Sequence, residues 1–431
     1  MTKSNETTSM SSPCKRSDNF SAGEDMTNRG SLTSWITVFM AFVAGAAMAN
    51  NYIMHPILPD VATSLDMKVS ATGLLAGATQ AGYLIGIFLL VPLGDLFNLK
   101  KVIIAQQIVL TLFLLFSALS TNYTMMLIGL FIVGLVSSSS LQISSLGFRV
   151  SPKKSRGATM GTIMAGISAG IVLSRIISGY LSDEYGWRSM LLILSGMTAF
   201  ITVIAIKLLP NNNIPVSQGK TYTSLLKRLP KILSANSMLK TSITVGSCWF
   251  FIFSMLWVSL SIYLYNHFSL TSTEIGLFGF AGLAGVLATR PAGKLVDRVG
   301  TKRVMAYSFV TIFIGIILLL FGVNTLWPLV FGVILFDVGV FSAQVANQMR
   351  VLSVDSASRN SVLSIYMCFY YGAGSLGSSL GSYILGAHGW FVLCGIAASV
   401  CAFGLLVVLK GMTNISDFST YPSSSARETN N

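Results

Sequence analysis

Two ionisable side chains lie inside long apolar stretches, where a charge could do chemistry within a membrane. Asp337 lies in the segment VILFDVGVFSAQ, residues 333–344, and Arg175 lies in SRIISG, residues 174–179. An ionised side chain at the centre of a bilayer costs about 2.5 kcal/mol or more, so such residues face a cavity or a partner rather than lipid. The carboxylate of Asp337 could therefore carry a proton, or it could form a gating or a permanent salt bridge with Arg175.

Other polar and aromatic side chains in apolar stretches are candidates to line the path of a solute. Gln344 and Gln348 follow Asp337 by 7 and 11 residues, which on a helix places them within about 20° of it. His55 could instead meet lipid headgroups, and for any single aromatic residue ordinary packing is the simpler role. The cavity candidates are Asn51, His55, Gln80, Tyr83, Gln142, Trp249, Tyr370, Gln344 and Gln348, with Trp257 and Tyr366 as further aromatic candidates.

The elements that must hold these residues are membrane-spanning helices. Hydrophobic residues make up 53% of the 431-residue chain and charged residues 10%, with a mean hydropathy of +0.70, whereas soluble domains carry about 25% charged residues. Windows of about 19 residues predict twelve spans, at residues 35–57, 71–93, 102–119, 124–148, 158–181, 188–209, 241–265, 275–292, 304–322, 326–349, 360–386 and 390–410. At about 1.5 Å per residue along their helices, Arg175 lies about 10 Å and Asp337 about 16 Å below the same face of the membrane, so the two side chains could meet.

The distribution of basic residues predicts how these spans are oriented. With a cytoplasmic N-terminus, all but Lys68, Arg175 and Arg188 of the 28 Lys and Arg residues fall in inner segments, as the positive-inside rule requires. We therefore expect both termini in the cytoplasm, and we attribute the net charge of +13 to membrane topology rather than to nucleic acid. The predicted organisation is a disordered cytoplasmic tail at 1–34, a six-helix bundle at 35–209, a cytoplasmic linker at 210–240, a second six-helix bundle at 241–410 and a tail at 411–431.

An internal repeat relates the two predicted bundles. Four pairs of landmarks keep a sequence offset of 201 to 203 residues, and a nearly constant offset across two six-helix blocks indicates a duplicated unit. The pairs are Asp95 with Asp297, Arg149 with Arg350, Arg156 with Arg359, and Gly186 with Gly389.

The segment GKLVDRVGTKR, residues 293–303, resembles the loop signature of the major facilitator superfamily. PILPDVA, QAGYLIGIFLLVPLGD, SRGATMGTIMAG and DVGVFSAQVANQMRVL together resemble a bacterial branch grouped with the drug:proton antiporters. The resemblance covers nearly the whole chain, and it implies an all-α polytopic membrane protein with twelve transmembrane helices in two six-helix repeats that rock around a central cavity. Two positions depart from the antiporter pattern, because Leu130 stands where an arginine is common and Arg175 where a proline is common.

The resemblance also implies a role for the loop signature, which would hold the two bundles together on the cytoplasmic side. Its glycines permit a tight turn, its aspartate can accept from the N–H groups at the start of a helix, and its basic residues can pair with carboxylates or lipid phosphates. A plain basic anchor is the alternative role. The residues of these predicted gate loops are Asp95, Lys100 and Lys101 in the first copy and Gly293, Asp297, Arg298, Gly300, Lys302 and Arg303 in the second.

Sequence motifs for other chemistries are missing or incomplete. The chain has no Walker motif, Rossmann fingerprint or metal-ligand spacing, and its five cysteines show no CxxC pair. We therefore expect neither an enzyme nor a bound cofactor or metal, and no direct use of ATP. The segment GSSLG, residues 377–381, fits the G-x-S-x-G pattern but lacks the strand and the base that a nucleophile would need.

We therefore expect a monomeric secondary transporter of the inner (plasma) membrane that moves a small organic solute outward, driven by protons. One alternative is uptake of a nutrient or siderophore by symport or facilitated diffusion, and another is a non-transporting membrane receptor or assembly protein on the same fold. The expected partners are the solute, protons and membrane lipids, with no nucleic acid. The lack of a cluster of buried arginines disfavours highly charged phosphates as the solute.

Overall fold

The computed structural model describes residues 34–152, 155–211, 233–234, 236–354 and 359–412. Regular structure in these ranges is helical, with no strand, so the expected all-α fold is confirmed. The predicted tails at 1–34 and 411–431 lie almost wholly outside the described residues, and so does most of the predicted linker at 210–240, whose last residues, 237–240, begin α10. The helices are α1 (Ser34–Ala49), α2 (Leu58–Ser64), α3 (Val69–Leu89), α4 (Leu93–Leu96), α5 (Leu99–Ala118), α6 (Tyr123–Ser137), α7 (Ser139–Val150), α8 (Arg156–Leu208), α10 (Ser237–Phe268), α11 (Ser272–Val299), α12 (Thr301–Phe321), α13 (Leu326–Ser353) and α14 (Arg359–Gly411).

Length and apolar composition make most of these helices suited to a bilayer. Within the described residues, nine helical stretches are long and apolar enough to cross a membrane, with α6 and α7 counted together as one, and α1 is a shorter apolar helix. The two longest, α8 and α14, have 53 residues each and break at Gly186 and Gly389, where φ is 79° and 80°. The count of twelve spans remains a prediction, and it requires each arm of α8 and α14, as well as α1, to cross once.

The two breaks are also evidence for the internal repeat. Gly186 and Gly389 were paired by sequence offset, and both adopt a backbone conformation that only glycine tolerates readily. In each case the next residue is a buried tryptophan, Trp187 or Trp390. The duplicated unit therefore appears in the backbone as well as in the sequence.

Two predicted spans are interrupted, and both interruptions have a local cause. The span at 35–57 was expected to be one helix, but α1 ends at Ala49 and residues 50–57 form turns. At the helix end the side-chain amide of Asn50 competes for the carbonyl of Ala46, and further on Pro56 disfavours a helical residue before it. The span at 124–148 breaks between α6 and α7 within a run of four serines. There the hydroxyl of Ser137 donates to the carbonyl of Val133, 2.7 Å away, and that of Ser138 to Leu135, 2.8 Å away, which competes with regular helix geometry.

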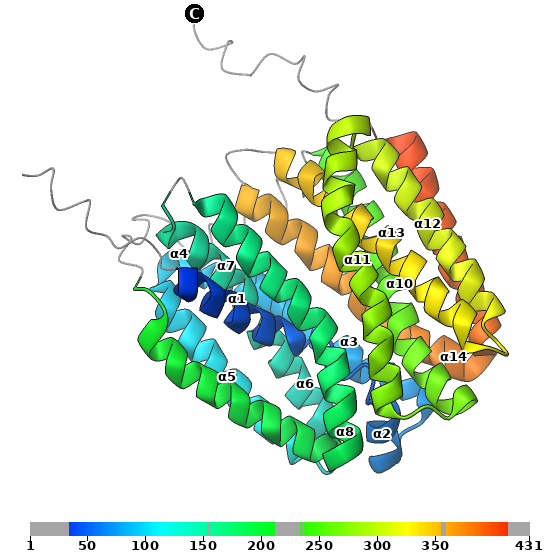
Figure 1. Cartoon of the computed structure of the whole chain (residues 1–431), viewed down its shortest axis with the longest axis horizontal. Helices are drawn as coiled ribbons and strands as arrows, with labels where there is room; N and C mark the ends of the chain where they lie inside the picture. Colours follow the sequence, from blue (N-terminus) through cyan, green and yellow to red (C-terminus); the bar gives the residue numbers. More distant parts are fainter. Residues whose placement is uncertain (1–33, 153–154, 212–232, 235, 355–358, 413–431) are drawn as a thin grey trace, which may run out of the picture.

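The helices form one elongated bundle in which α1 to α8, the first half of the chain, lie mainly at one side and α10 to α14, the second half, at the other (Figure 1). Contact between the halves runs mainly along two helix pairs, α3 with α14 and α8 with α11. Small residues let these backbones approach. A Cβ on Gly276 of α11, for example, would lie 2.6 Å from the carbonyl oxygen of Arg175 on α8. We call the end of the bundle that carries α2 the α2 end, and the end where α1 begins and α14 ends the terminal end (Figure 1).

Candidate functional site

The two buried charges predicted from the sequence come together through one tryptophan. The guanidinium carbon of Arg175 on α8 lies 3.7 Å from the centre of the Trp257 ring on α10. The indole Nε1–H of Trp257 in turn donates a hydrogen bond of 3.2 Å to Oδ1 of Asp337 on α13. Trp257 therefore connects the arginine of the first half to the aspartate of the second by a cation–π contact and a hydrogen bond.

All three of these side chains are withdrawn from the molecular surface, and several of their polar atoms lack a partner. Arg175 is 3% exposed and Asp337 is 0% exposed. Within the described residues, Oδ2 of Asp337 and both Nε and Nη2 of Arg175 make no hydrogen bond. A buried, unpartnered charge costs free energy, so this arrangement is poised to gain from a proton, a solute or a direct ion pair.

A glycine leaves space between the two charges. A Cβ added to Gly282 on α11 would lie 2.7 Å from Oδ2 of Asp337 and 3.6 Å from Nη1 of Arg175. Both charged groups therefore border the same small space beside α11. The glycine at this position leaves room for the carboxylate and the guanidinium to approach each other.

Residues of the turns after α1 lie beside this cluster. The ring of Tyr52 is 5.4 Å from the guanidinium carbon of Arg175 and packs edge-on to His55 at 5.5 Å. His55 and the neighbouring Asn51 are buried, and both ring nitrogens of His55 and Oδ1 of Asn51 lack partners within the described residues. The imidazole therefore does not lie at an exposed outer surface, where lipid headgroups would meet it.

A second group of candidates joins the halves through α3, α10 and α14. Ser254 of α10 donates to Oε1 of Gln80 on α3 at 3.1 Å, while Nε2 of Gln80 stays unpartnered within the described residues. Tyr83 of α3 packs on Tyr371 of α14 with ring centres 4.4 Å apart, and its hydroxyl shares a hydrogen bond with Ser140. Aromatic rings and free amide groups therefore meet where the halves touch.

Trp249 and Tyr370 complete an aromatic cluster next to this contact. Tyr370 stacks on Phe250 with ring centres 3.8 Å apart, and Trp249 lies 6.2 Å from Tyr370. Trp249 is fully buried, and its Nε1 has no partner among the described residues. Tyr366 lies 5.6 Å from Tyr370 and belongs to the same cluster.

Three of the predicted cavity residues lie apart from these clusters. Gln142 donates to the carbonyl of Leu90 at 2.6 Å and so ties α7 to the end of α3. Gln344 and Gln348 are half-buried on α13, whereas Asn347 between them is fully buried and donates to the carbonyl of Ser242 on α10 at 2.9 Å. Sequence reasoning missed Asn347, because the helical stripe through Asp337 favoured its neighbours.

The predicted gate loops make no bond across the halves in the part of the chain that the structure describes. Asp297, Arg298 and Arg303 are exposed, Lys302 is half-buried, and Gly300 ends α11 with φ of 86°. In the first copy, Lys100 and Lys101 lie in the first turn of α5, and the side chain of Asp95 is outside the described set. Their role in holding the halves together at the terminal end therefore remains a prediction.

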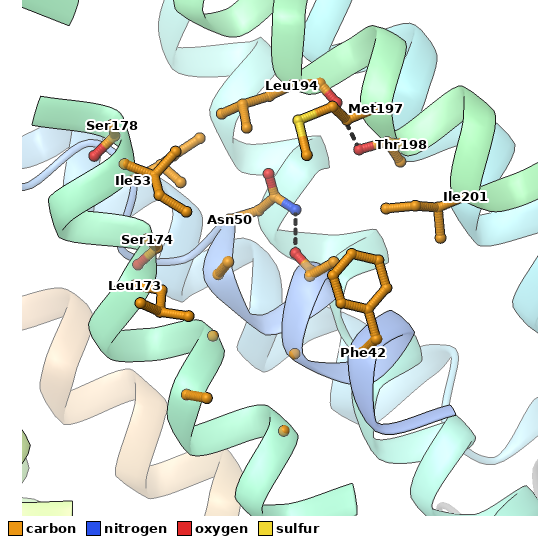
Figure 2. Close-up of a pocket in the computed structure, with 17 residues that line it drawn as sticks. Phe42, Asn50, Ile53, Leu173, Ser174, Ser178, Leu194, Met197, Thr198 and Ile201 are labelled. Atoms are coloured by element: carbon orange, nitrogen blue, oxygen red, sulfur yellow. Dashed lines mark hydrogen bonds between the residues drawn. The ribbon is translucent and has the colours of Figure 1, made fainter. Parts of the chain in front are cut away.

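A separate hollow of about 230 Å³ lies in the first half, between α1 and α8 (Figure 2). It is open at Phe42 and Leu173, which are 54% and 48% exposed, and its lining is mostly apolar. Asn50 is the main polar group, and its amide nitrogen donates to the carbonyl of Ala46 at 2.9 Å (Figure 2). None of the predicted site residues lines this hollow, so it is distinct from the central cluster.

Long apolar helices, with buried charges where the two halves meet, are the features of a membrane transporter in which the halves move against each other. Comparison with known proteins agrees with this class. The family model described as "Major Facilitator Superfamily" matches residues 40–289 and 243–415. The chain belongs to the Major Facilitator Superfamily, and it is a transporter rather than an enzyme.

Individual relatives and solved structures are similar over most of the chain. It is 29% identical over 381 residues to "Uncharacterized transporter YgaY" of Escherichia coli O157:H7, which covers 88% of this chain and 96% of that relative. It is 25% identical over 350 residues to "Probable sugar efflux transporter" of Mannheimia succiniciproducens, covering 77% and 82%. Among solved structures, the nucleoside transporter NupG superposes with a TM-score of 0.68 at 16% identity, covering 87% and 97%, which is a likeness of fold alone.

Proposed function

We propose that the protein is a proton-coupled secondary transporter that exports a small polar solute of the sugar class by alternating access. The observation that carries the proposal is the unpartnered Oδ2 of Asp337, a fully buried carboxylate oxygen that borders the same space as the guanidinium of Arg175 from the other half. Protonation would keep the carboxyl neutral in this position. Loss of the proton would leave a buried anion that draws the guanidinium toward it, and so couple the proton to movement between the halves.

The class of solute is proposed from the groups that surround this cluster and from the relatives. Faces of aromatic rings, with a few free amide and imidazole groups, suit a solute that has apolar faces and several hydroxyl groups. The free groups are Oδ1 of Asn51, Nε2 of Gln80 and the ring nitrogens of His55. Efflux of sugars is the activity printed in the names of several relatives.

We further propose that both termini lie in the cytoplasm and that the protein acts as a monomer in the inner membrane. In this orientation the α2 end faces outward and the terminal end faces the cytoplasm. The proposed latching role of the gate-loop residues, Asp297 above all, would then belong to the state in which the terminal end is closed.

Purified protein in proteoliposomes tests the function. We expect counterflow of at least one radiolabelled monosaccharide or disaccharide, and faster sugar efflux when the compartment facing the α2 end is acidified. Asp337→Asn should keep counterflow but lose the dependence on the pH gradient, because the amide cannot release a proton. Glu184→Gln, at an exposed carboxylate outside the cluster, is the matched control. Flux in Asp337→Asn that responds to pH as in the wild type would reject coupling through this site, and no counterflow of any sugar would reject the solute class.

A further inference from the structure

The first backbone N–H groups of α11 find their hydrogen-bond acceptors in both halves of the chain. A helix leaves its first four N–H groups without intrahelical acceptors. In α11, Oε2 of Glu274 accepts from the N–H of Thr271 at 2.9 Å, and Oγ1 of Thr271 accepts from the N–H of Glu274 at 3.3 Å. This capping box is local to the helix and satisfies two of the four donors.

The other two donors are satisfied by a carboxylate from the first half. Oδ1 of Asp183, on α8, accepts from the N–H of Ser272 at 3.1 Å, and Oδ2 of the same residue accepts from the N–H of Thr273 at 2.7 Å. The charge therefore lies at the positive end of a 28-residue helix. The first turn of α11 is complete only while α8 lies against it.

A second carboxylate from the first half binds the same turn. The hydroxyl of Ser272, which is 1% exposed, donates to Oδ2 of Asp60 on α2 at 2.6 Å. Ser182, next to Asp183 on α8, donates to the same oxygen at 3.4 Å. Asp60 thus links α2, α8 and α11 at one point.

Backbone packing brings these groups within reach of each other. Gly179 lies one helical turn before Asp183 on α8, and a Cβ there would overlap the carbonyl oxygen of Ser272. A larger residue would therefore hold α8 away from α11 at the position where the carboxylate must reach the helix start. The contacts of Asp183, Asp60 and Gly179 with the start of α11 join the first half to the second at the α2 end (Figure 1).

We propose that Asp183 and Asp60 form a latch between the halves at the α2 end, with the first turn of α11 as its receiver, and that opening this end in the transport cycle requires both carboxylates to leave Ser272 and Thr273. We call these residues, with Ser182, the α2-end latch. The proposal rests on the alternating access proposed above. It adds positioning residues for that cycle, because the latch touches neither the central cluster nor a solute.

Labelling of a buried cysteine measures the latch without any transport. Ser382 on α14 is fully buried at the α2 end, where its Oγ accepts from the N–H of Gly73 on α3 at 2.9 Å across the halves. In a background without the five native cysteines, the rate at which a maleimide labels Ser382→Cys reports how often this end opens. Thr121→Cys, at an exposed position outside the latch, corrects for the reactivity of the reagent.

Each latch variant has an expected rate. Asp183→Asn should label about 2- to 5-fold faster, the effect of an exposed charge at a helix start. Asp183→Lys should label about 10-fold faster, because it adds repulsion by the same helix end. Asp60→Ala should also label faster, because it removes the oxygen that accepts from the hydroxyls of Ser272 and Ser182. Glu184→Gln, which changes the next residue along α8, should label at the wild-type rate.

The outcomes separate this proposal from the proposed function. Wild-type labelling rates in both Asp183→Asn and Asp60→Ala would overturn the latch, and these variants decide the matter even if Asp183→Lys does not fold. Faster labelling of Glu184→Gln to the same extent would also overturn it, because any carboxylate at this end would then serve. The measurement needs neither sugar nor a pH gradient, so a failure to find sugar transport would leave its result intact.

Discussion

The hydrogen bond from Trp257 to Asp337 can be removed while the aromatic face that Arg175 contacts is kept. Trp257→Phe deletes the Nε1–H that lies 3.2 Å from Oδ1 of Asp337, and it leaves a ring for the guanidinium, which is 3.7 Å from the ring centre. Oδ2 of Asp337 already lacks a hydrogen-bond partner within the described residues, and after this change Oδ1 would lose the donor that Trp257 provides. We therefore expect a clear loss of stability and an altered dependence of transport on pH.

The size of the effect follows from the type of bond. A hydrogen bond to a charged group contributes about 1.5–3 kcal/mol, and one between neutral groups about 1 kcal/mol. At a pH high enough to ionise Asp337, Trp257→Phe should therefore cost about 2 kcal/mol in the wild type and about 1 kcal/mol in the background of Asp337→Asn, where the acceptor is a neutral amide. The difference, a coupling energy of about 1 kcal/mol, exceeds the roughly 0.3–0.5 kcal/mol within which independent sites add.

The assay is a double-mutant cycle on the free energy of unfolding in mixed micelles. It compares the wild type, Trp257→Phe, Asp337→Asn and the double variant. Trp249→Phe is the matched control, because Trp249 is equally buried but its Nε1 has no partner in the described structure. Its substitution should cost less and show no coupling to Asp337. Additive costs for Trp257→Phe and Asp337→Asn would refute the connection through the indole.

Three further predictions concern the ends and the packing of the bundle. Burial and the nearby carboxylate of Asp183 raise the pKa of Asp60, and the hydroxyls of Ser272 and Ser182 partly offset this rise. The closed α2 end therefore binds more protons than the open one, so Ser382→Cys, measured relative to Thr121→Cys, should label more slowly as pH falls through the raised pKa. Asp60→Asn should remove this trend. Gly186→Ala and Gly389→Ala should each lower stability by about 1–3 kcal/mol from backbone strain alone, since a Cβ at either position meets nothing within 4 Å; unchanged melting temperatures would show that the breaks do not need glycine. Gly166→Ala should destabilise the protein, because the added Cβ would overlap the carbonyl oxygen of Ala41. Gly161 on the same helix has open space around it, so Gly161→Ala should be neutral or stabilising. Equal effects of the two variants on thermal unfolding would contradict close packing of α1 on α8.

Helical periodicity and bilayer depth indicated from the sequence that Arg175 and Asp337 could meet. Both quantities follow from the fixed rise of a helix and the cost of a charge in lipid. The mediating role of Trp257 could not be predicted in the same way, because it depends on the rotation of α10 about its own axis. Sequence alone offered several equivalent aromatic residues, and only the packed structure shows which one is 3.7 Å from the guanidinium.

The same limit explains why the α2-end latch escaped sequence analysis. Asp60 and Asp183 lie outside the predicted spans, where an acidic residue needs no special explanation. Asp183 binds two backbone N–H groups on a helix about 90 residues further along the chain, and backbone donors have no sequence signature beyond the capping box itself. Asp60 binds the hydroxyl of Ser272, which is 212 residues away in the sequence. The run of turns after Ala49 escaped for a different reason, because hydropathy windows average over single residues such as Asn50 and Pro56 that favour turns.

The two sites are linked by a single piece of helix. Arg175 and Asp183 both belong to the arm of α8 that precedes the break at Gly186, and eight residues of helix place them about 12 Å apart. Between them, Gly179 holds this arm against the start of α11. A shift of the arm that moved the guanidinium toward Asp337 would therefore also move the carboxylate of Asp183 relative to Ser272 and Thr273. Because packed helices shift as rigid units, the charge state of Asp337 and the closure of the α2 end would be coupled through the geometry of α8 itself.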